Sequence, residues 1–375
     1  MQLNVGRAVT PNGVVENAAI EISGERIVAI GPGGGGGEFA RLWAVPGFVD
    51  THCHGAVGVS FGDDDVAANL RAVEYHRSQG STTLFASTVT EPVEKLERQL
   101  ATLRGIVESG DLDGIHLEGP FLAVEFKGAH DENLLCDPIP ERVERLIAAG
   151  GPALKMITLA VERPHAEAAT RRFVEAGVKV AFGHSDAGYE TAAASLDWGA
   201  DVVTHLFNAM HGIHHRVPGP IPVLLTDPRV MCELICDGIH SHPTVVAMAI
   251  DAAGPGRIAL VTDAMSATGH GDGRYVLGEL EVVVEDGTAR LVTADGTPGA
   301  IAGSTLTMAK AFEFVVQRAG VSIPVAATMA ATTPAAWHRL DDVGTLEPGK
   351  RADVCFVDDD GRLHAVLRRG VWARR

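Results

Sequence analysis

Six side chains of the kinds that bind metal ions lie at or just after the ends of short apolar runs in the sequence. His52 and His54 follow a run that ends at Asp50. The other four end or follow later runs, and they are Glu118, His184, His205 and Asp263. A carboxylate or imidazole at the end of a buried strand is expensive to desolvate unless it coordinates an ion or pairs with another group. We therefore predict a metal site at which these six residues converge.

The types of these ligands indicate which ions the site would take. Imidazole and carboxylate without thiolate favour Zn2+ or a similar divalent ion such as Fe2+, Mn2+ or Co2+. Six ligand groups exceed the need of one catalytic ion with an open position, but they suit two ions that share a bridging ligand. The spacing alone leaves other groupings open. The grouping we expect is His52, His54 and Asp263 on one ion, His184 and His205 on the other, and Glu118 between them.

Elements that could bring these residues together are visible as a repeating pattern after Trp43. Eight apolar, β-branched runs alternate with stretches of helical period such as 66–78, 93–108, 141–149 and 165–176. The runs are 44–50, 82–87, 114–118, 155–160, 178–183, 201–205, 230–237 and 257–263. Strands that alternate with helices form parallel sheets, and eight repeats predict a TIM-like (β/α)8 barrel in an α/β protein. A doubly wound open sheet is the alternative. The carboxyl ends of barrel strands meet at one mouth, where the six ligands would converge.

The two ends of the chain have a different pattern from the middle. Both alternate apolar and polar residues between turn signals, which is typical of half-buried strands. We predict a small β-sandwich domain built from residues 1–43 and 345–375, beside a catalytic barrel domain over residues 44–344. Within the latter, we expect a hairpin over 275–292, closed by Asp286-Gly287, and helices over 306–318 and 325–331.

Composition narrows the class of protein further. The chain has 375 residues, 46% of them hydrophobic, and a net charge of −17, which excludes a disordered chain and disfavours nucleic-acid or membrane partners. The first residues lack a signal-peptide pattern and no apolar run reaches the length of a membrane span, so we expect a cytoplasmic protein. Five cysteines without a C-x-x-C pair argue against a disulfide framework.

Longer motifs surround the predicted ligands. They are PGFVDTHCHG at 46–55, GIHLEGPF at 114–121, KGAH at 127–130, GHS at 183–185, THLFNAM at 204–210, DGIH at 237–240, VTDA at 261–264, IAGSTLTM at 301–308 and GTLEPGKRAD at 344–353. Over nearly its whole length the chain thereby resembles the amidohydrolase superfamily and, within it, the N-acetylglucosamine-6-phosphate deacetylase family. The H-x-H and the closing G-x-L-x-x-G-x-x-A-D motif mark the superfamily only, whereas the others are more specific.

The resemblance implies a reaction and a division of the ligands. The reaction is hydrolysis of N-acetyl-D-glucosamine 6-phosphate to D-glucosamine 6-phosphate and acetate, in amino-sugar catabolism. By resemblance, Glu118, His184 and His205 hold the ion common to the family. Because His52 and His54 are both present, the sequence is similar to the two-ion form. Another amidohydrolase, such as a hydantoinase or deaminase, or an inactive metal-binding homologue, remains an alternative.

Substrate-binding residues are also implied by the resemblance. His130 would contact the acetamide carbonyl and His240 the sugar, while Asn208 and Ala209 would meet the phosphate, partly through backbone N–H groups. Arg216 would reach the phosphate in the partner subunit of a homodimer.

A metal ion lowers the pKa of a bound water toward about 7. We expect Asp263 to take the proton of this water and give it to the departing amine, and His130 to help stabilise the oxyanion.

Two residues keep two interpretations each. His116, two residues before Glu118, either supports the metal site or is a hydrogen-bonded core histidine. Cys136 lies in a segment after His130 that could form a lid, and its thiol is either a spectator or a neighbour of the metals.

Overall fold

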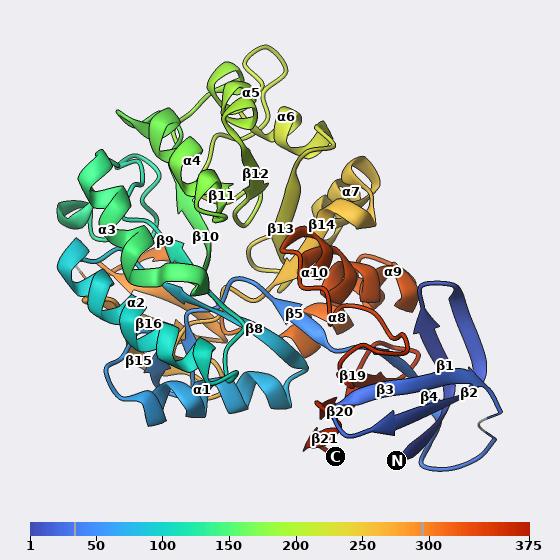
Figure 1. Ribbon diagram of the computed structural model, residues 1–375. Helices are drawn as coiled ribbons and strands as arrows, with labels where there is room; N and C mark the ends of the chain where they lie inside the picture. Colours follow the sequence, from blue (N-terminus) through green and yellow to red (C-terminus); the bar gives the residue numbers. More distant parts are fainter. Residues whose placement is uncertain (34, 294–295) are drawn as a thin grey trace.

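A barrel of parallel strands forms the centre of the protein. The computed structural model describes residues 1–33, 35–293 and 296–375 (Figure 1). Eight strands hydrogen-bond in the order β14-β13-β12-β11-β10-β9-β8-β5, each parallel to its neighbour. They are β5 (Phe48–Asp50), β8 (Ser81–Thr88), β9 (Gly114–Glu118), β10 (Leu154–Leu159), β11 (Lys179–Phe182), β12 (Ala200–Val203), β13 (Met231–Ile235) and β14 (Ile258–Val261). The predicted (β/α)8 barrel is thereby confirmed.

Contacts between the first and last strands close the barrel on the side where the metal ligands lie. Just beyond the strand ends, Cys53 and Ala264 form a parallel bridge. The Asp263 N–H donates to the His52 carbonyl at 2.8 Å. Below them, the buried Asp50 carboxylate accepts hydrogen bonds from the N–H and hydroxyl of Thr262. Barrel closure therefore fixes the segment that carries His52 and His54 against the one that carries Asp263.

Helices surround the barrel (Figure 1). They are α1 (Val66–Ser78), α2 (Val93–Glu108), α3 (Pro140–Gly150), α4 (Ala166–Glu175), α5 (Tyr189–Trp198), α6 (Ile221–Thr226), α7 (Pro243–Ala253), α8 (Met308–Gln317), α9 (Ile323–Ala327) and α10 (Thr333–Trp337). In α2, Leu96, Leu100 and Leu103 are fully buried at helical spacing, so one face packs on the sheet. Among the described residues, every helix is too short or too polar to cross a lipid bilayer.

The barrel interior changes character along its axis. Small or flexible apolar side chains from five consecutive strands fill one level, and they are Met156, Ala181, Val202, Met231 and Ala259. Because residues two apart share a strand face, Thr158 and Glu233 lie one level nearer the carboxyl ends of β10 and β13. Both are completely buried. A polar layer therefore separates the apolar interior from the barrel mouth.

The two chain termini share a seven-stranded sheet, which confirms a separate β domain built from both ends of the chain. Its order is β21-β20-β19-β4-β1-β2-β3. The strands are β1 (Gln2–Thr10), β2 (Gly13–Ser23), β3 (Arg26–Pro32), β4 (Phe39–Pro46), β19 (Val354–Val357), β20 (Leu363–Arg368) and β21 (Val371–Arg374). Figure 1 shows the N- and C-termini near one another on this side of the molecule. The boundaries at residues 43 and 345 stay a prediction.

One predicted strand is wrong in its bounds. The run 44–50 is not a single barrel strand, because residues 44–46 belong to β4 and pair with β1 and β19. Only β5 joins the barrel. Pro46 has no N–H to donate to a strand ladder. At Gly47 an added Cβ would lie 2.2 Å from Thr82 Oγ1, so the chain passes closely over β8 as it changes sheets.

A separate four-stranded sheet follows the eighth barrel strand. Its members are β15 (Gly273–Leu277), β16 (Leu280–Glu285), β17 (Thr288–Val292) and β18 (Pro298–Ile301). The predicted turn at Asp286-Gly287 joins β16 to β17, with φ of 49° and 73° at its two residues. The expected hairpin is thus part of a larger antiparallel sheet, from which Leu277 and Ile301 reach the cavity described below.

Candidate active site

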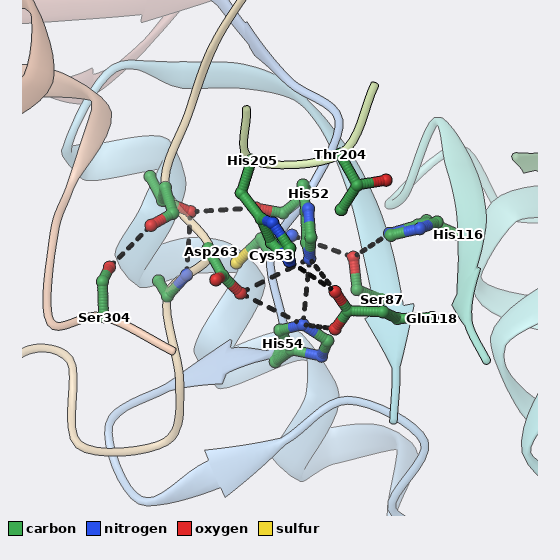
Figure 2. A network of polar contacts seen from close by, with 12 residues as sticks. His52, Cys53, His54, Ser87, His116, Glu118, Thr204, His205, Asp263 and Ser304 are labelled. Atoms are coloured by element: carbon green, nitrogen blue, oxygen red, sulfur yellow. Dashed lines mark hydrogen bonds and ion pairs between the residues drawn. The ribbon is translucent and has the colours of Figure 1, made fainter. Parts of the chain in front are cut away.

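The six predicted ligands come together at the carboxyl ends of the barrel strands. Figure 2 shows five of them, His52, His54, Glu118, His205 and Asp263, directed toward one point. His52 and His54 follow β5, and Glu118 is the last residue of β9. The other three each follow a strand end by two residues: His184 follows β11, His205 follows β12, and Asp263 follows β14. All six are buried.

The first group of ligand atoms consists of His52, His54 and Asp263. The Nε2 atoms of the two histidines lie 3.1 Å apart. Asp263 Oδ1 lies 3.4 Å from His52 Nε2 and 3.2 Å from His54 Nε2. These three side chains and Glu118 offer ligand atoms within 4.8 Å of one another.

The second group consists of His184 and His205, whose Nε2 atoms also lie 3.1 Å apart. Glu118 joins the two groups through its two carboxylate oxygens. Oε1 lies 3.1 Å from His184 Nε2 and 3.2 Å from His205 Nε2. Oε2 lies 3.0 Å from His54 Nε2. The geometry thus has the arrangement expected from the sequence, with one carboxylate between two pairs of histidines.

These residues fit divalent metal ions. Zn–N and Zn–O bonds of about 2.0–2.2 Å in tetrahedral geometry put neighbouring ligand atoms roughly 3.3 Å apart, close to the spacings seen here. The donor set is imidazole and carboxylate, which Zn2+ and similar ions accept. The Nε2 atoms of His52 and His54 lie 3.1 Å apart among buried carboxylates, and a cation bound between these groups would offset the cost of burying their charge.

Three of the six residues have unusual backbone conformations. His184, His205 and Asp263 have φ of 49°, 30° and 49°, in the left-handed region that side chains with a Cβ rarely adopt. Such conformations cost about 1–3 kcal/mol each and persist where the surrounding structure enforces them, often at functional sites. Barrel closure enforces the one at Asp263 through the bond of its N–H to His52.

The histidines of the cluster lower the pKa values of its two carboxyl groups. Burial alone would raise the pKa of Asp263, but the His52 charge and a hydrogen bond from His54 lower it to about 2. Burial alone would also raise the pKa of Glu118, but the surrounding histidines hold this pKa well below its usual range. Asp263 is therefore ionised at neutral pH and able to accept a proton.

His130 lies at the edge of the cluster with a defined tautomer. Its Nδ1 accepts a hydrogen bond from the Thr90 backbone N–H at 3.2 Å, so the ring proton of the neutral imidazole lies on Nε2. Burial lowers the pKa of His130 to about 4, which keeps the ring neutral near pH 7. Nε2 lies 3.5 Å from Glu118 Oε2, next to the metal ligands. The ring can thus donate one N–H toward a group bound there.

A cavity of about 510 Å³ opens over the cluster. Besides most of the ligands, its lining includes His130, Asn208, Ala209 and His240. His240 Nδ1 lies 2.7 Å from the Asp237 carboxylate, which also accepts the backbone N–H groups of Ile239 and His240. Burial alone would lower the pKa of His240, but the Asp237 carboxylate raises it above its usual value. The backbone N–H of Asn208 donates to the His205 carbonyl at 3.0 Å and is therefore occupied. Of the two predicted backbone donors to the phosphate, Ala209 is the one left.

Arg216, unlike the other predicted substrate-binding residues, does not line this cavity. It lies in an exposed loop, residues 211–217, in which Ile213 and Val217 are 55% and 72% exposed. The predicted role of Arg216 concerns a second subunit and stays a prediction.

His116 and Cys136 lie in different surroundings. His116 is completely buried, with its ring nitrogens hydrogen-bonded to the hydroxyls of Ser87 and Thr158. Its ring packs edge-on against His52, with 4.5 Å between centroids, so it both fills the core and supports a predicted ligand. Cys136 does not line the cavity above the cluster, but lies in a separate one beside Pro92 and Arg142.

Glu233 is a residue of the site that the sequence analysis did not select. It lies within β13, is completely buried, and contacts His52 Nδ1 at 3.1 Å. The available signal was a single charged residue inside the apolar segment MCELI.

A (β/α)8 barrel with histidines and carboxylates gathered at its mouth is an arrangement typical of metal-dependent hydrolases. Residues 43–373 match the model of the Amidohydrolase family, and the chain belongs to this family. It is 35% identical to N-acetylgalactosamine-6-phosphate deacetylase of Escherichia coli O157:H7, over 87% of this chain and 86% of that one. It is also 35% identical to N-acetylglucosamine-6-phosphate deacetylase of Vibrio furnissii, over 87% and 82%.

Solved structures of deacetylases are also similar to this chain. N-acetyl-D-glucosamine-6-phosphate deacetylase of Mycobacterium smegmatis, an aspartate-to-alanine variant in complex with N-acetyl-D-glucosamine 6-phosphate, superposes with a TM-score of 0.93 at 40% identity, over 100% of this chain and 99% of that one. N-acetylglucosamine-6-phosphate deacetylase of Thermotoga maritima gives a TM-score of 0.90 at 32% identity over the whole of both chains. The similarity therefore covers the terminal sheet as well as the barrel.

Proposed function

We propose that this chain hydrolyses N-acetyl-D-glucosamine 6-phosphate to D-glucosamine 6-phosphate and acetate, as part of amino-sugar catabolism. One observation carries the proposal: His130, Asn208, Ala209, His240 and Asp263 line one cavity over the cluster of histidines and carboxylates. The names of relatives at 35–40% identity over most of the chain support the same reaction. N-acetyl-D-galactosamine 6-phosphate is a second candidate substrate, because an equally similar relative bears that name.

The six buried ligands would hold two divalent ions, most simply Zn2+, with Fe2+, Mn2+ and Co2+ as alternatives. His52, His54 and Asp263 would bind one ion, His184 and His205 the other, and Glu118 both. A divalent ion bound there supplies Lewis-acid activation of water and of the amide carbonyl.

The remaining steps fall to side chains of the protein. Asp263, ionised at neutral pH because its pKa is about 2, would take a proton from the attacking water. It would then return this proton to the nitrogen of the departing amine. The Nε2–H of His130 would donate a hydrogen bond to the acetamide oxygen, whose negative charge grows in the transition state. His240 would bind the sugar and hold it in register with these groups.

Phosphate recognition would need a second subunit. We propose a homodimer in which Arg216 of each chain reaches the phosphate in the other chain's cavity, together with the Asn208-Ala209 turn. Arg216 lies in an exposed loop that also presents two apolar side chains, Ile213 and Val217. A second subunit would cover this loop in the dimer. A guanidinium suits a phosphate because it donates two parallel hydrogen bonds.

A cytoplasmic location completes the proposal. All five cysteines are free thiols, and four of them are buried, which suits a reducing compartment.

The experiment that tests the proposed substrate is acetate release from a panel of sugars. The panel contains N-acetylglucosamine and N-acetylgalactosamine, each with and without a 6-phosphate. We expect the highest kcat/KM with N-acetylglucosamine 6-phosphate. A preference for the galactosamine compound would support the second candidate, and no acetate from any member would contradict both.

Metal analysis tests the two-ion site. The native protein should bind two ions per chain, and the variant with His52→Asn and His54→Asn should lose one and keep the other. A native protein that never binds more than one ion per chain would contradict the two-ion arrangement.

A further inference from the structure

Glu233 is a charged side chain in the interior of the barrel that the proposed reaction does not use. It projects from β13 one level above the apolar residue Met231, and it is completely buried. Burying a carboxylate is costly unless the group is paired, and an apolar residue at such a position is often equally or more stabilising. Its presence here therefore calls for a functional reason.

Among the described residues, the side-chain carboxylate of Glu233 makes its polar contacts with one short segment. Oε2 lies 3.1 Å from His52 Nδ1, and Oε1 accepts a hydrogen bond from the Thr51 hydroxyl at 3.2 Å. The two oxygens thus grip consecutive residues of the segment that carries the first pair of predicted ligands. The Thr51 contact fixes the carboxylate so that its other oxygen faces the imidazole.

When the His52 ring is neutral, as it must be to bind an ion, it has one proton, and the carboxylate oxygen 3.1 Å from Nδ1 accepts a hydrogen bond there, so this proton lies on Nδ1. Nε2 then has a free lone pair. This atom is the one that faces His54 Nε2 at 3.1 Å and Asp263 Oδ1 at 3.4 Å, in the space that would hold an ion. The opposite tautomer would put a hydrogen into that space.

The four predicted histidine ligands differ in what lies behind them. His184 Nδ1 has a neutral partner, the Phe126 carbonyl, at 2.8 Å. The Nδ1 atoms of His54 and His205 are buried and find no hydrogen-bond partner among the described residues. Of these four Nδ1 atoms, the one in His52 faces a carboxylate. The effect of Glu233 should therefore be confined to the ion that His52 binds.

We infer that Glu233 is a positioning residue that fixes His52 in the Nδ1–H tautomer and selectively strengthens the metal subsite of His52, His54 and Asp263. The inference rests on the two-ion site proposed above. A carboxylate behind a metal-bound imidazole orients the ring and raises its basicity, and its loss typically weakens metal affinity 10- to 100-fold.

The test measures the affinity of each Zn2+ or Co2+ ion by competition with a chelator, in native protein, Glu233→Leu and Glu233→Gln. We expect Glu233→Leu to weaken one ion about 10- to 100-fold and to leave the other unchanged. Glu233→Gln should have a smaller effect, because its amide oxygen can still accept from Nδ1–H. The matched control is Glu91→Leu, which removes another buried glutamate, paired with Lys95 at 2.7 Å, and should leave both affinities unchanged.

Two results would overturn the inference: native affinity for both ions in Glu233→Leu, or equal weakening of both in a folded variant. If Glu233→Leu does not fold, Glu233→Gln decides by the same criteria. The tautomer of the neutral His52 ring in metal-free protein, read from 15N-labelled histidine by NMR at an alkaline pH where the ring has a single proton and assigned with His52→Asn, is independent of the number of ions. Nδ1–H in the native protein supports the inference even if only one ion binds, and Nε2–H refutes it.

Discussion

The backbone N–H of Thr90 donates a hydrogen bond to Nδ1 of His130 across 40 residues of sequence. Thr90 follows β8, whereas His130 lies in the long segment after β9, so two neighbouring strand ends fix one imidazole. The contact selects the tautomer with its proton on Nε2, on the side of the metal ligands. A neutral imidazole held in this way can donate a hydrogen bond from Nε2 without carrying a charge.

His130→Ala should therefore lower kcat and leave the metal content unchanged. We expect a loss on the order of 10² to 10³-fold, the usual effect of removing one donor to an oxyanion. Steady-state kinetics and elemental analysis together check this. The ligand atoms of His130 also lie within 4.8 Å of those of Glu118 and His184. Loss of an ion from the variant would therefore show that His130 is a ligand instead.

Asp263→Asn should separate proton transfer from metal binding. Asparagine preserves the shape of the side chain and one oxygen, but it cannot take a proton. We expect the ion held by His184 and His205 to remain, and turnover to fall by on the order of 10² to 10⁴-fold. Turnover close to the native value would remove Asp263 from the mechanism.

The pair of His240 and Asp237 predicts how substrate binding depends on pH. Because Asp237 raises the pKa of His240, the imidazolium persists to higher pH than for an ordinary histidine and is lost as pH rises through this raised pKa. KM for the anionic sugar phosphate should therefore rise on the alkaline side. The expected rise is about tenfold, since hydrogen bonds of charged groups exceed neutral ones by roughly 1–1.5 kcal/mol.

Asp237→Asn provides the matched variant for this profile. Without the carboxylate the pKa of His240 falls, so the rise in KM should begin at lower pH, and kcat should change less than KM. A KM profile that is the same in native protein and variant would contradict a charged role for His240.

The Arg216 prediction concerns the phosphate alone. Arg216→Ala should lower kcat/KM for the phosphorylated sugar on the order of 10²-fold, as expected for a lost charged hydrogen bond, and change it little for N-acetylglucosamine. Co-expression of Arg216→Ala chains with Asp263→Asn chains should restore part of the activity, because one site of each mixed dimer then has both residues. Equal loss on both sugars would refute the phosphate role, and no recovery would assign Arg216 to its own chain's site.

The parts of the fold that were predictable are those in which local pattern and burial agree. The bounds of β9, α1 and α2 coincide with the runs expected from the sequence. The division between β4 and β5 was not predictable from hydrophobicity, because both sides of Pro46-Gly47 are apolar and buried although they join different sheets. β18 was also missed, because the segment PGAI contains proline and glycine and has little strand character.

In the site, too, local pattern reveals some residues and misses others. Histidines and carboxylates at strand ends stand out because they interrupt apolar runs, so all six predicted ligands could be selected from the sequence. Glu233 and Thr90 could not be assigned, because their importance lies in the atoms they face across the barrel, His52 Nδ1 and His130 Nδ1. The sequence does not contain this information without the register of neighbouring strands.

We propose that a metal ion held by this cluster is required for hydrolysis of an N-acetylated sugar phosphate. The most direct measurement is the release of acetate and glucosamine 6-phosphate from N-acetylglucosamine 6-phosphate by native protein, by protein stripped with a chelator, and by stripped protein reloaded with Zn2+. We predict equal amounts of the two products, loss of activity on stripping, and recovery on reloading. Full activity in protein shown by elemental analysis to be metal-free would contradict it.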